Sequence, residues 1–119
     1  MVDLHPAIYK LLKGVCRVSM EFPSTAEQFP VITLAEVSNI EDLTIDGTER
    51  ISDVTYQVDV WDNGKNRQRC EQLAAEAAEI LTGHGFTRIL GRGFRDASGL
   101  HRKMMYFKLY AINGFVKLK

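Results

Sequence analysis

The sequence predicts an α+β fold, a mainly antiparallel sheet with two helices packed on one face, formed by a single domain over residues 1–119. Three observations predict it. Apolar and polar residues alternate along residues 51–61 and 101–112, as in strands with one buried face. Between these strands, apolar residues recur at helical spacing over residues 65–82. Asp46-Gly47 and Asn113-Gly114 are strong hairpin signals, because their turns require positive φ angles.

The N-terminal region is predicted to form a helix and two strands. Residues 5–14 form the helix, because Ile8, Leu11 and Leu12 share one face and Pro6 suits the first turn. A short strand, a loop with two prolines and a second strand then follow, over residues 15–20, 21–30 and 31–38. These elements supply the first helix and the first strands of the sheet.

Residues 39–50 are rich in acidic side chains, and they allow two interpretations. They form either a flexible loop, or the ends of two extended strands that make one long hairpin with Asp46-Gly47 at its tip. The strand over residues 51–61 alone would span roughly 36 Å at ~3.3 Å per residue. A hairpin of that length would project beyond the core of a small domain, and we favour this projecting arrangement.

The strand over residues 51–61 has one apolar and one polar face. The apolar face carries Val54, Tyr56, Val58 and Val60, and the polar face carries Asp53, Thr55, Gln57 and Asp59. Asn63 and Asn66 are the candidate caps of the helix that follows. The inner side of this helix carries the residues at helical spacing, which are Cys70, Leu73, Ala74, Ala77, Ile80 and Leu81.

Further strands complete the predicted sheet. Residues 86–94 form a strand interrupted by Gly91 and Gly93, where we expect a bulge or a bend. Residues 101–112 form the most apolar strand, and its inner face carries Met105, Phe107, Leu109 and Ala111. A last short strand is expected over residues 115–119.

The net charge of the chain is zero, but its two halves carry opposite charges. Residues 1–62 hold eleven acidic and four basic residues, a net charge of −7, and residues 63–119 hold the reverse, +7. The basic residues are scattered over a helix and strands, so we do not expect a disordered basic tail. Either the two halves attract each other within one monomer, or the acidic surface of one subunit meets the basic surface of the next. The second contact is head-to-tail and closes into a ring when the rotation permits.

The sequence offers no convincing catalytic or metal-binding constellation. Asp53 and Asp59 share a strand face but lie about 20 Å apart, too far to chelate one metal, whereas Glu36 could lie across the sheet from one of them. The stretch Gly91-Arg92-Gly93 lacks the third glycine and the following helix of a phosphate loop. The three histidines and two cysteines match no triad, metal or redox spacing. We therefore expect no enzymatic activity, no cofactor and no metal.

The two cysteines and the hydropathy pattern bear on the compartment. Cys16 and Cys70 are expected to be free thiols in a reducing cytoplasm, and Cys70 lies on the apolar side of its helix. No apolar run approaches the ~20 residues that a membrane helix needs. The first residues lack the features of a signal peptide. We therefore expect no membrane partner.

Several residues are candidates for contacts with other protein. Trp61 ends its strand on the polar side and is predicted to be an exposed interface anchor, although it could instead fold over the start of the helix. Tyr106 and Tyr110 are candidates of the same kind. Five bases cluster with Phe86 and Phe94, namely Arg88, Arg92, Arg95, Arg102 and Lys103. We favour a basic surface between subunits over nucleic-acid binding, because the pI is near 6.8 and no recognition motif is present.

A family resemblance rests on three strings, YQVDVWDNGKNRQRCEQLAAEAAEIL, then GFTRI, then HRKMMYFKLY. Together they resemble the small tail-completion or tail-terminator (tail-to-head joining) proteins of long-tailed bacteriophages and prophages. Asp59, Val60 and Trp61 match the strand end in the family pattern, and Gly85-Phe86 matches the element after the helix. The resemblance covers roughly residues 5–112, and the acidic segment over residues 39–50 departs from it.

The resemblance implies a structural subunit that assembles with itself as a ring, often a hexamer, on the end of the tail tube. It implies a location in the virion tail or neck and, during assembly, in the cytoplasm of the bacterial host. The ring would contact the tail tube protein and the head connector or neck proteins, with no enzymatic activity and with DNA only passing through its lumen. The expected assembly residues are Trp61, Asp46, Glu49, Arg88, Arg92, Arg95, Tyr106 and Tyr110. The alternatives are another neck or head-closure protein of the virion, or a small bacterial ligand-binding domain or enzyme.

Overall fold

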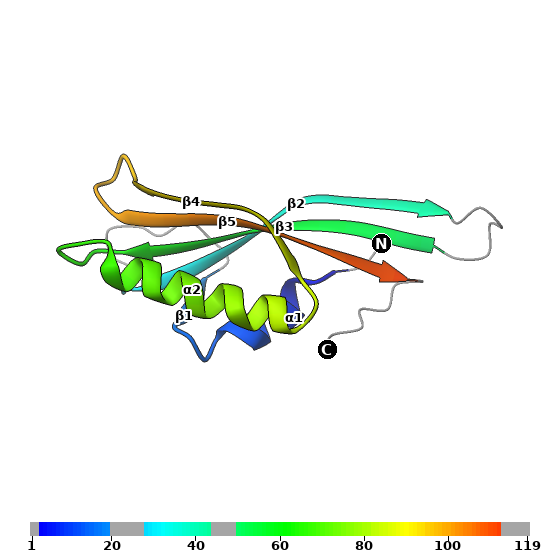
Figure 1. Cartoon of the computed structure of the whole chain (residues 1–119), viewed down its shortest axis with the longest axis horizontal. Helices are drawn as coiled ribbons and strands as arrows, with labels where there is room; N and C mark the ends of the chain where they lie inside the picture. The colour runs from blue at the N-terminus through cyan, green and yellow to red at the C-terminus, as the bar shows by residue number, and fades with distance from the viewer. Residues whose placement is uncertain (1–2, 20–27, 44–49, 113–119) are drawn as a thin grey trace.

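The computed structural model describes residues 3–19, 28–43 and 50–112, and these residues form two helices and one five-stranded sheet (Figure 1). In chain order the elements are α1 (His5–Leu12), β1 (Arg17–Ser19), β2 (Val31–Leu43), β3 (Arg50–Asp62), α2 (Gln68–Gly83), β4 (Thr87–Arg95) and β5 (His101–Ile112). Both helices pack against the same face of the sheet (Figure 1). The predicted α+β fold class is confirmed.

The strand order is β1-β2-β3-β5-β4, and it makes the sheet mostly antiparallel. β2, β3, β5 and β4 pair with one another antiparallel, whereas β1 pairs parallel with β2. β1 is short and covers only Val31–Thr33 of β2. The centre of the sheet is therefore β3, which is the strand with the clearest alternation in the sequence.

β2 and β3 form a long hairpin that extends past the helices. β2 runs well beyond the predicted strand over residues 31–38, and its last residue, Leu43, lies opposite Arg50, the first residue of β3. Residues 39–43 are thus strand, as the extended-hairpin interpretation requires, while the Asp46-Gly47 tip lies outside the described residues. The molecule is elongated, 55 × 24 × 21 Å, and the hairpin projects beyond α1 and α2 (Figure 1).

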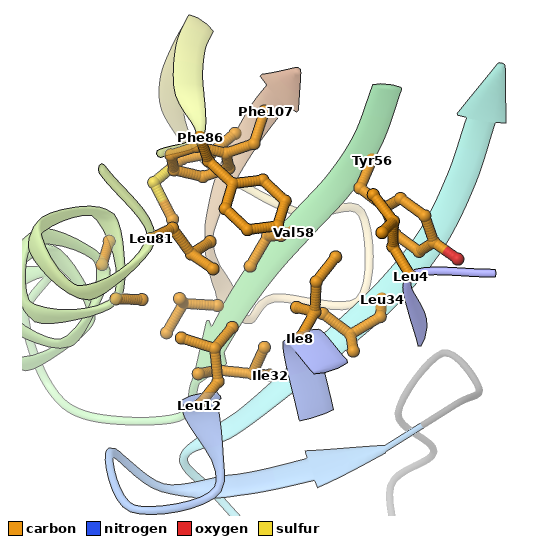
Figure 2. Close-up of a cluster of buried hydrophobic side chains, with 14 of the residues drawn as sticks. Leu4, Ile8, Leu12, Ile32, Leu34, Tyr56, Val58, Leu81, Phe86 and Phe107 are labelled. Atoms are coloured by element: carbon orange, nitrogen blue, oxygen red, sulfur yellow. The ribbon is translucent and has the colours of Figure 1, made fainter. Parts of the chain in front are cut away.

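The core lies between the helices and the inner face of β3 and β5. Ile8 and Leu12 of α1 are fully buried, and Figure 2 shows them among Ile32, Val58 and Leu81. The predicted inner residues of both strands are buried, namely Val54, Tyr56, Val58, Val60, Met105, Phe107 and Leu109. The side chain of Ala111 lies outside the described part. Side chains alternate between the two faces of a strand, so every second residue of β3 and β5 points into the core.

The buried side of α2 combines small side chains with Leu81 and packs against the sheet. Cys70, Ala74, Ala77 and Leu81 are buried on that side, as the helical spacing predicts. The N-cap residue of α2 is Arg67, so the prediction of Asn63 or Asn66 as the cap is wrong, although Oδ1 of Asn66 accepts a hydrogen bond from the backbone N–H of Gln68 at 3.0 Å. The helix ends at Gly83, and the chain turns into β4 through Gly85, whose φ of 99° favours glycine.

β4 differs from the prediction of a strand interrupted at its glycines. Its ladder with β5 runs from Thr87 to Arg95, and the bulge lies between Arg88 and Leu90. Gly91 and Gly93 occupy regular positions in the ladder, opposite Met105 and Lys103. Gly93 leaves space that Glu71 fills, whereas a Cβ on Gly91 would make only an ordinary contact with Arg88, and neither glycine bends the strand.

The remaining features are the turn between β4 and β5, the predicted last strand and the hydropathy of the helices. A turn closed by Asp96 and Leu100 joins β4 to β5. The last predicted strand, over residues 115–119, lies outside the described residues. Among the helices of the described part, none has the length and hydropathy to cross a membrane.

Candidate assembly surface

The face of the sheet opposite the helices is the candidate surface, and we call it the open face. Alternation along β3 places Asp53, Thr55, Gln57, Asp59 and Trp61 on it. The register adds residues from β5 and β4, because residues directly opposite each other on paired strands share a face. These are Arg102, Met104, Tyr106, Lys108 and Tyr110 of β5 and Leu90, Arg92 and Phe94 of β4.

Trp61 lies on this face, but the prediction that it is exposed is wrong. Its side chain is 4% exposed, and its indole Nε1 donates a hydrogen bond to Oγ1 of Thr33 at 2.8 Å. The guanidinium carbon of Arg102, directly opposite in the register, lies 4.3 Å from the centroid of the indole ring. A cation this close to a tryptophan face stabilises the pair and shields the ring from water. Trp61 therefore works inside the subunit.

Arg102 also holds the most buried acid of the open face. Its Nη2 lies 2.6 Å from Oδ2 of Asp59, and its Nη1 lies 3.3 Å from Oδ1 of Asp96. Gln57 donates a further hydrogen bond to Oδ2 of Asp59 at 2.9 Å. Burial raises the pKa of Asp59, and the hydrogen bonds from Arg102 and Gln57 offset part of that rise. Within the described residues, Oδ1 of Asp59 is buried without a hydrogen-bond partner.

Aromatic rings and cations continue along the face on both sides of this cluster. The ring of Phe94 lies 5.4 Å from the guanidinium carbon of Arg102 and 5.6 Å from that of Arg92. Toward the long hairpin, Lys108 pairs with Asp53 at 3.0 Å, and its Nζ lies 5.4 Å from the ring centroid of Tyr110. The open face thus presents cations stacked on aromatic rings, which is a common composition for protein contacts.

The structure divides the predicted assembly residues between the two faces. Arg92, Tyr106 and Tyr110 lie on the open face, and Tyr110 is 59% exposed. Arg88 and Arg95 are exposed on the helix-bearing side of β4, since they lie opposite Phe107 and His101. Asp46 and Glu49 lie outside the described residues. The five bases that cluster in the sequence are therefore split by strand alternation.

The ion pairs show, for part of the acidic half, whether it attracts the basic half within one subunit or between subunits. Three pairs join an acid of residues 1–62 to a base of residues 63–119, namely Asp53–Lys108, Asp59–Arg102 and Asp62–Arg69. For these three acids the intramolecular interpretation is confirmed.

A hollow of about 360 Å³ lies between the start of α2 and the β4–β5 turn, and its walls include Cys70, Glu71, Arg95 and His101. The Sγ of Cys70 donates to the carbonyl oxygen of Val60 at 3.3 Å, and burial raises the pKa of its thiol to about 11. A neutral, buried thiol is a poor nucleophile. Arg95 Nη2 lies 3.3 Å from His101 Nε2, so both groups are already engaged.

Comparison with protein families decides the affiliation of this fold. A model of the family described as tail completion protein gp17 matches residues 4–108, which is most of the chain. The chain belongs to this tail completion family. The resemblance drawn from the strings around Trp61 is thus confirmed, and the family is one of phage tail structural proteins, which implies a non-enzymatic role. A search of curated proteins found no match.

The acidic residues of this tail completion protein do not converge as the sequence allowed. Glu36 lies opposite Tyr56, whereas the residues of β2 opposite Asp53 and Asp59 are Ile40 and Thr33. The suggestion that Glu36 faces one of these aspartates is therefore wrong, because the register places Glu36 with Tyr56 on the helix-bearing face, whereas Asp53 and Asp59 lie on the open face. In residues 3–19, 28–43 and 50–112, no group of three or more His, Cys, Asp or Glu side chains could hold a metal.

Sequence reasoning missed the organising role of Arg102 in this tail completion protein. The sequence marks Arg102 only as one base among five, because its partners Asp59 and Trp61 lie more than forty positions earlier. The available signal was the alternation itself. Once β3 and β5 are paired, Trp61 and Arg102 fall opposite each other.

Proposed function

We propose that this tail completion protein is a tail-terminator or head–tail joining subunit that assembles as a ring, often a hexamer in such proteins, on the end of the tail tube. The observation that carries the proposal is the family match over residues 4–108. The mechanism is capping. The ring adds to the last layer of the tube and offers that layer no further copy of the polymerising surface. The proposed location is the tail or neck of the virion.

Two features of the described residues support a structural role. Among the described residues, helices cover one face of the sheet only, and exposed side chains remain on the opposite face and on both edge strands. Exposed side chains on them include Tyr110 and Arg92 of the open face. In the proposed ring these residues, with Tyr106, Arg88, Arg95, Asp46 and Glu49, contact neighbouring subunits, the tail tube protein or the head connector. Trp61 contributes indirectly, by holding Arg102.

The first experiment measures the mass of the purified protein by light scattering over a range of concentrations. A ring predicts a mass several times 13.5 kDa at high concentration, and annular particles in negative-stain micrographs. A second experiment adds the protein to polymerising tail tube protein. We expect shorter tubes with the added subunit bound at one end. A protein that stays monomeric at every concentration and leaves tube length unchanged would contradict the proposal.

A binding experiment with the purified protein distinguishes a tail terminator from a head-closure or neck protein. A head-closure or neck protein would bind the isolated head connector but leave tube growth unaffected. Retention on DNA that disappears with added salt would instead point to nucleic-acid binding through Arg88, Arg92 and Arg95.

A further inference from the structure

Among residues 3–19, 28–43 and 50–112, no strand pairs with the outer side of β4 or with most of the outer side of β2. β1 pairs with Val31–Thr33 only, so among the described strands none covers β2 over residues 34–38. At the other edge, β4 pairs with β5 on one side, and no described strand lies on its outer side. An open strand edge presents unpaired backbone donors and acceptors and is a template for another strand.

Exposed apolar residues gather on these two edge strands. The large exposed apolar side chains of β2 are Val37 and Ile40, at 48% and 60%, and those of β4 are Ile89 and Leu90, at 53% and 41%. Val37 and Ile89 are the extra residues of the two bulges, which lie between Glu36 and Ser38 and between Arg88 and Leu90. Edges that must remain unpaired usually carry charge at such positions. Here both edges present apolar side chains.

The edges also carry opposite charges. Within β2 the charged residues are Glu36, Glu41 and Asp42, with no base from Val31 to Leu43. Within β4 they are Arg88, Arg92 and Arg95, with no acid from Thr87 to Arg95. Each edge is therefore repelled by a copy of itself and attracted by the other edge.

We infer that the β2 edge of one subunit pairs with the β4 edge of the next, so that the sheet continues from subunit to subunit. The strand directions permit it. β2 and β4 run in opposite directions within one sheet, so a neighbour in the same orientation brings them together antiparallel, as in the rest of the sheet. This inference rests on the proposed ring and names the surfaces that build it.

Charge selects head-to-tail contacts over two-fold dimers. Pairing β2 with β2, or β4 with β4, would place like charges side by side, which opposes association. Pairing unlike edges is heterologous, and such contacts close into a ring when the rotation is right. β1 blocks the first residues of β2, so the neighbour is displaced along the strands toward the long hairpin. Closed sheets need a stagger of this kind.

A charge exchange between Glu36 and Arg88 tests the inference. Both lie on the helix-bearing side of their strands, opposite Tyr56 and Phe107, and neither makes an ion pair among the described residues. Glu36→Arg and Arg88→Glu should each raise the concentration at which the protein assembles by about tenfold or more, which corresponds to about 1.4 kcal/mol. The double variant, and an equimolar mixture of the two single variants, should assemble like the wild type.

The matched controls reverse exposed charges away from the edges. Glu79→Arg on α2 and Lys65→Glu before α2 should leave assembly unchanged. Circular dichroism and thermal unfolding show that each variant is folded. If the wild type forms rings while both single edge variants assemble normally, or the double variant fails to recover, the edge inference is overturned and the ring proposal stands. A wild type that never assembles overturns both.

Crosslinking of the bulge residues gives a second, independent readout. A chain with Val37→Cys and Ile89→Cys should form a ladder of disulfide-linked oligomers under mild oxidation. Each single variant should give no ladder beyond the background of Cys16 and Cys70. Val37→Cys combined with Tyr9→Cys is the control, because Tyr9 is exposed and belongs to α1, not to an edge strand. A ladder of equal length in the control would overturn the inference.

Discussion

A Cβ atom on Gly93 would lie 2.5 Å from Oε1 of Glu71, whose other carboxylate oxygen pairs with Lys103 at 3.0 Å. The carboxylate of Glu71, in the first turn of α2, therefore lies against the backbone of β4 at Gly93. Any larger residue at this position would have to displace the flexible carboxylate of Glu71, while no positive φ favours glycine there. This contact ties the helix to the edge strand that we assign to assembly.

Replacing Gly93 by Ala should therefore displace Glu71 and break its pair with Lys103. Because the pair is partly exposed, we expect a loss of about 1 kcal/mol or less. In a Glu71→Ala background the same replacement should stabilise by about 0.4–1 kcal/mol, since alanine restricts the unfolded chain. Urea unfolding of the four proteins measures this coupling. Gly91→Ala is the control, because its Cβ would meet Arg88 at an ordinary 3.5 Å. Equal effects in both backgrounds would contradict the contact.

The buried position of Trp61 predicts its spectroscopic behaviour. As the single tryptophan, it should show the blue-shifted emission of a shielded indole and weak quenching by iodide, in both monomer and assembly. Trp61→Phe should cost about 1–3 kcal/mol of unfolding free energy, because it removes the hydrogen bond to Thr33. Trp61→Ala should cost about 3–5 kcal/mol. Emission that shifts only upon assembly would instead support an interface anchor.

Removing the cation of the Asp59–Arg102 pair should strongly destabilise the fold. Arg102→Met leaves the buried Asp59 carboxylate without its partner, and we expect a loss of about 3–5 kcal/mol. Adding Asp59→Leu should recover much of it, because the buried charge is gone. Chemical denaturation of the three variants measures the recovery. A double variant no more stable than Arg102→Met would contradict the role assigned to the pair.

The same pair predicts how stability depends on acidity. Burial raises the pKa of Asp59 above its ordinary 3.8, so just above that value the folded chain binds more protons than the unfolded chain. The contribution of Asp59 to stability therefore grows as the pH falls through its folded pKa. The effect should be larger in Arg102→Met, which lacks the hydrogen bond that lowers this pKa. Denaturation of both proteins at several pH values above 3.8 checks the sign.

Alkaline pH should destabilise the protein through three groups. Burial raises the pKa of Cys16 and of Cys70 from 9.0 to about 11, and that of Tyr56 from 10.0 to about 12. Between each pair of values the unfolded chain loses a proton that the folded chain keeps, so stability falls as the pH rises. Cys70→Ala should reduce the slope between pH 9 and 11, where the contribution of Cys16 remains, and Tyr56→Phe should reduce it between pH 10 and 12. Thermal unfolding of the wild type and both variants between pH 9 and 12 measures these slopes. A variant with the same pH dependence as the wild type would contradict the role of the replaced group.

Much of the fold is predictable from the sequence because the spacing of apolar residues within each helix or strand reveals that element. Ile8 and Leu12 mark α1 by helical spacing, and the alternation around Tyr56 and Phe107 marks both central strands. These signals lie within a single element, so no knowledge of its neighbours is needed. The family resemblance has the same origin, since its strings span one strand, one helix and one later strand.

The failures lie where a contact joins distant parts of the chain. Trp61 was expected at the surface because the strand gives its direction but not the Arg102 that covers it. The glycines of β4 suggested a bend, since the sequence does not show that Glu71 fills the space above Gly93. The actual bulge, at Ile89, falls in an unremarkable apolar run. Register and packing between elements decide all three.

The order of the strands has a consequence for the shape of any closed assembly. One end of the sheet carries the β4–β5 turn and the start of α2, and the other end carries the long β2–β3 hairpin (Figure 1). Subunits joined β2 to β4 all point the same way, so the resulting annulus has two chemically different rims. A component with unlike rims can receive one structure below and a different one above, without any change of conformation.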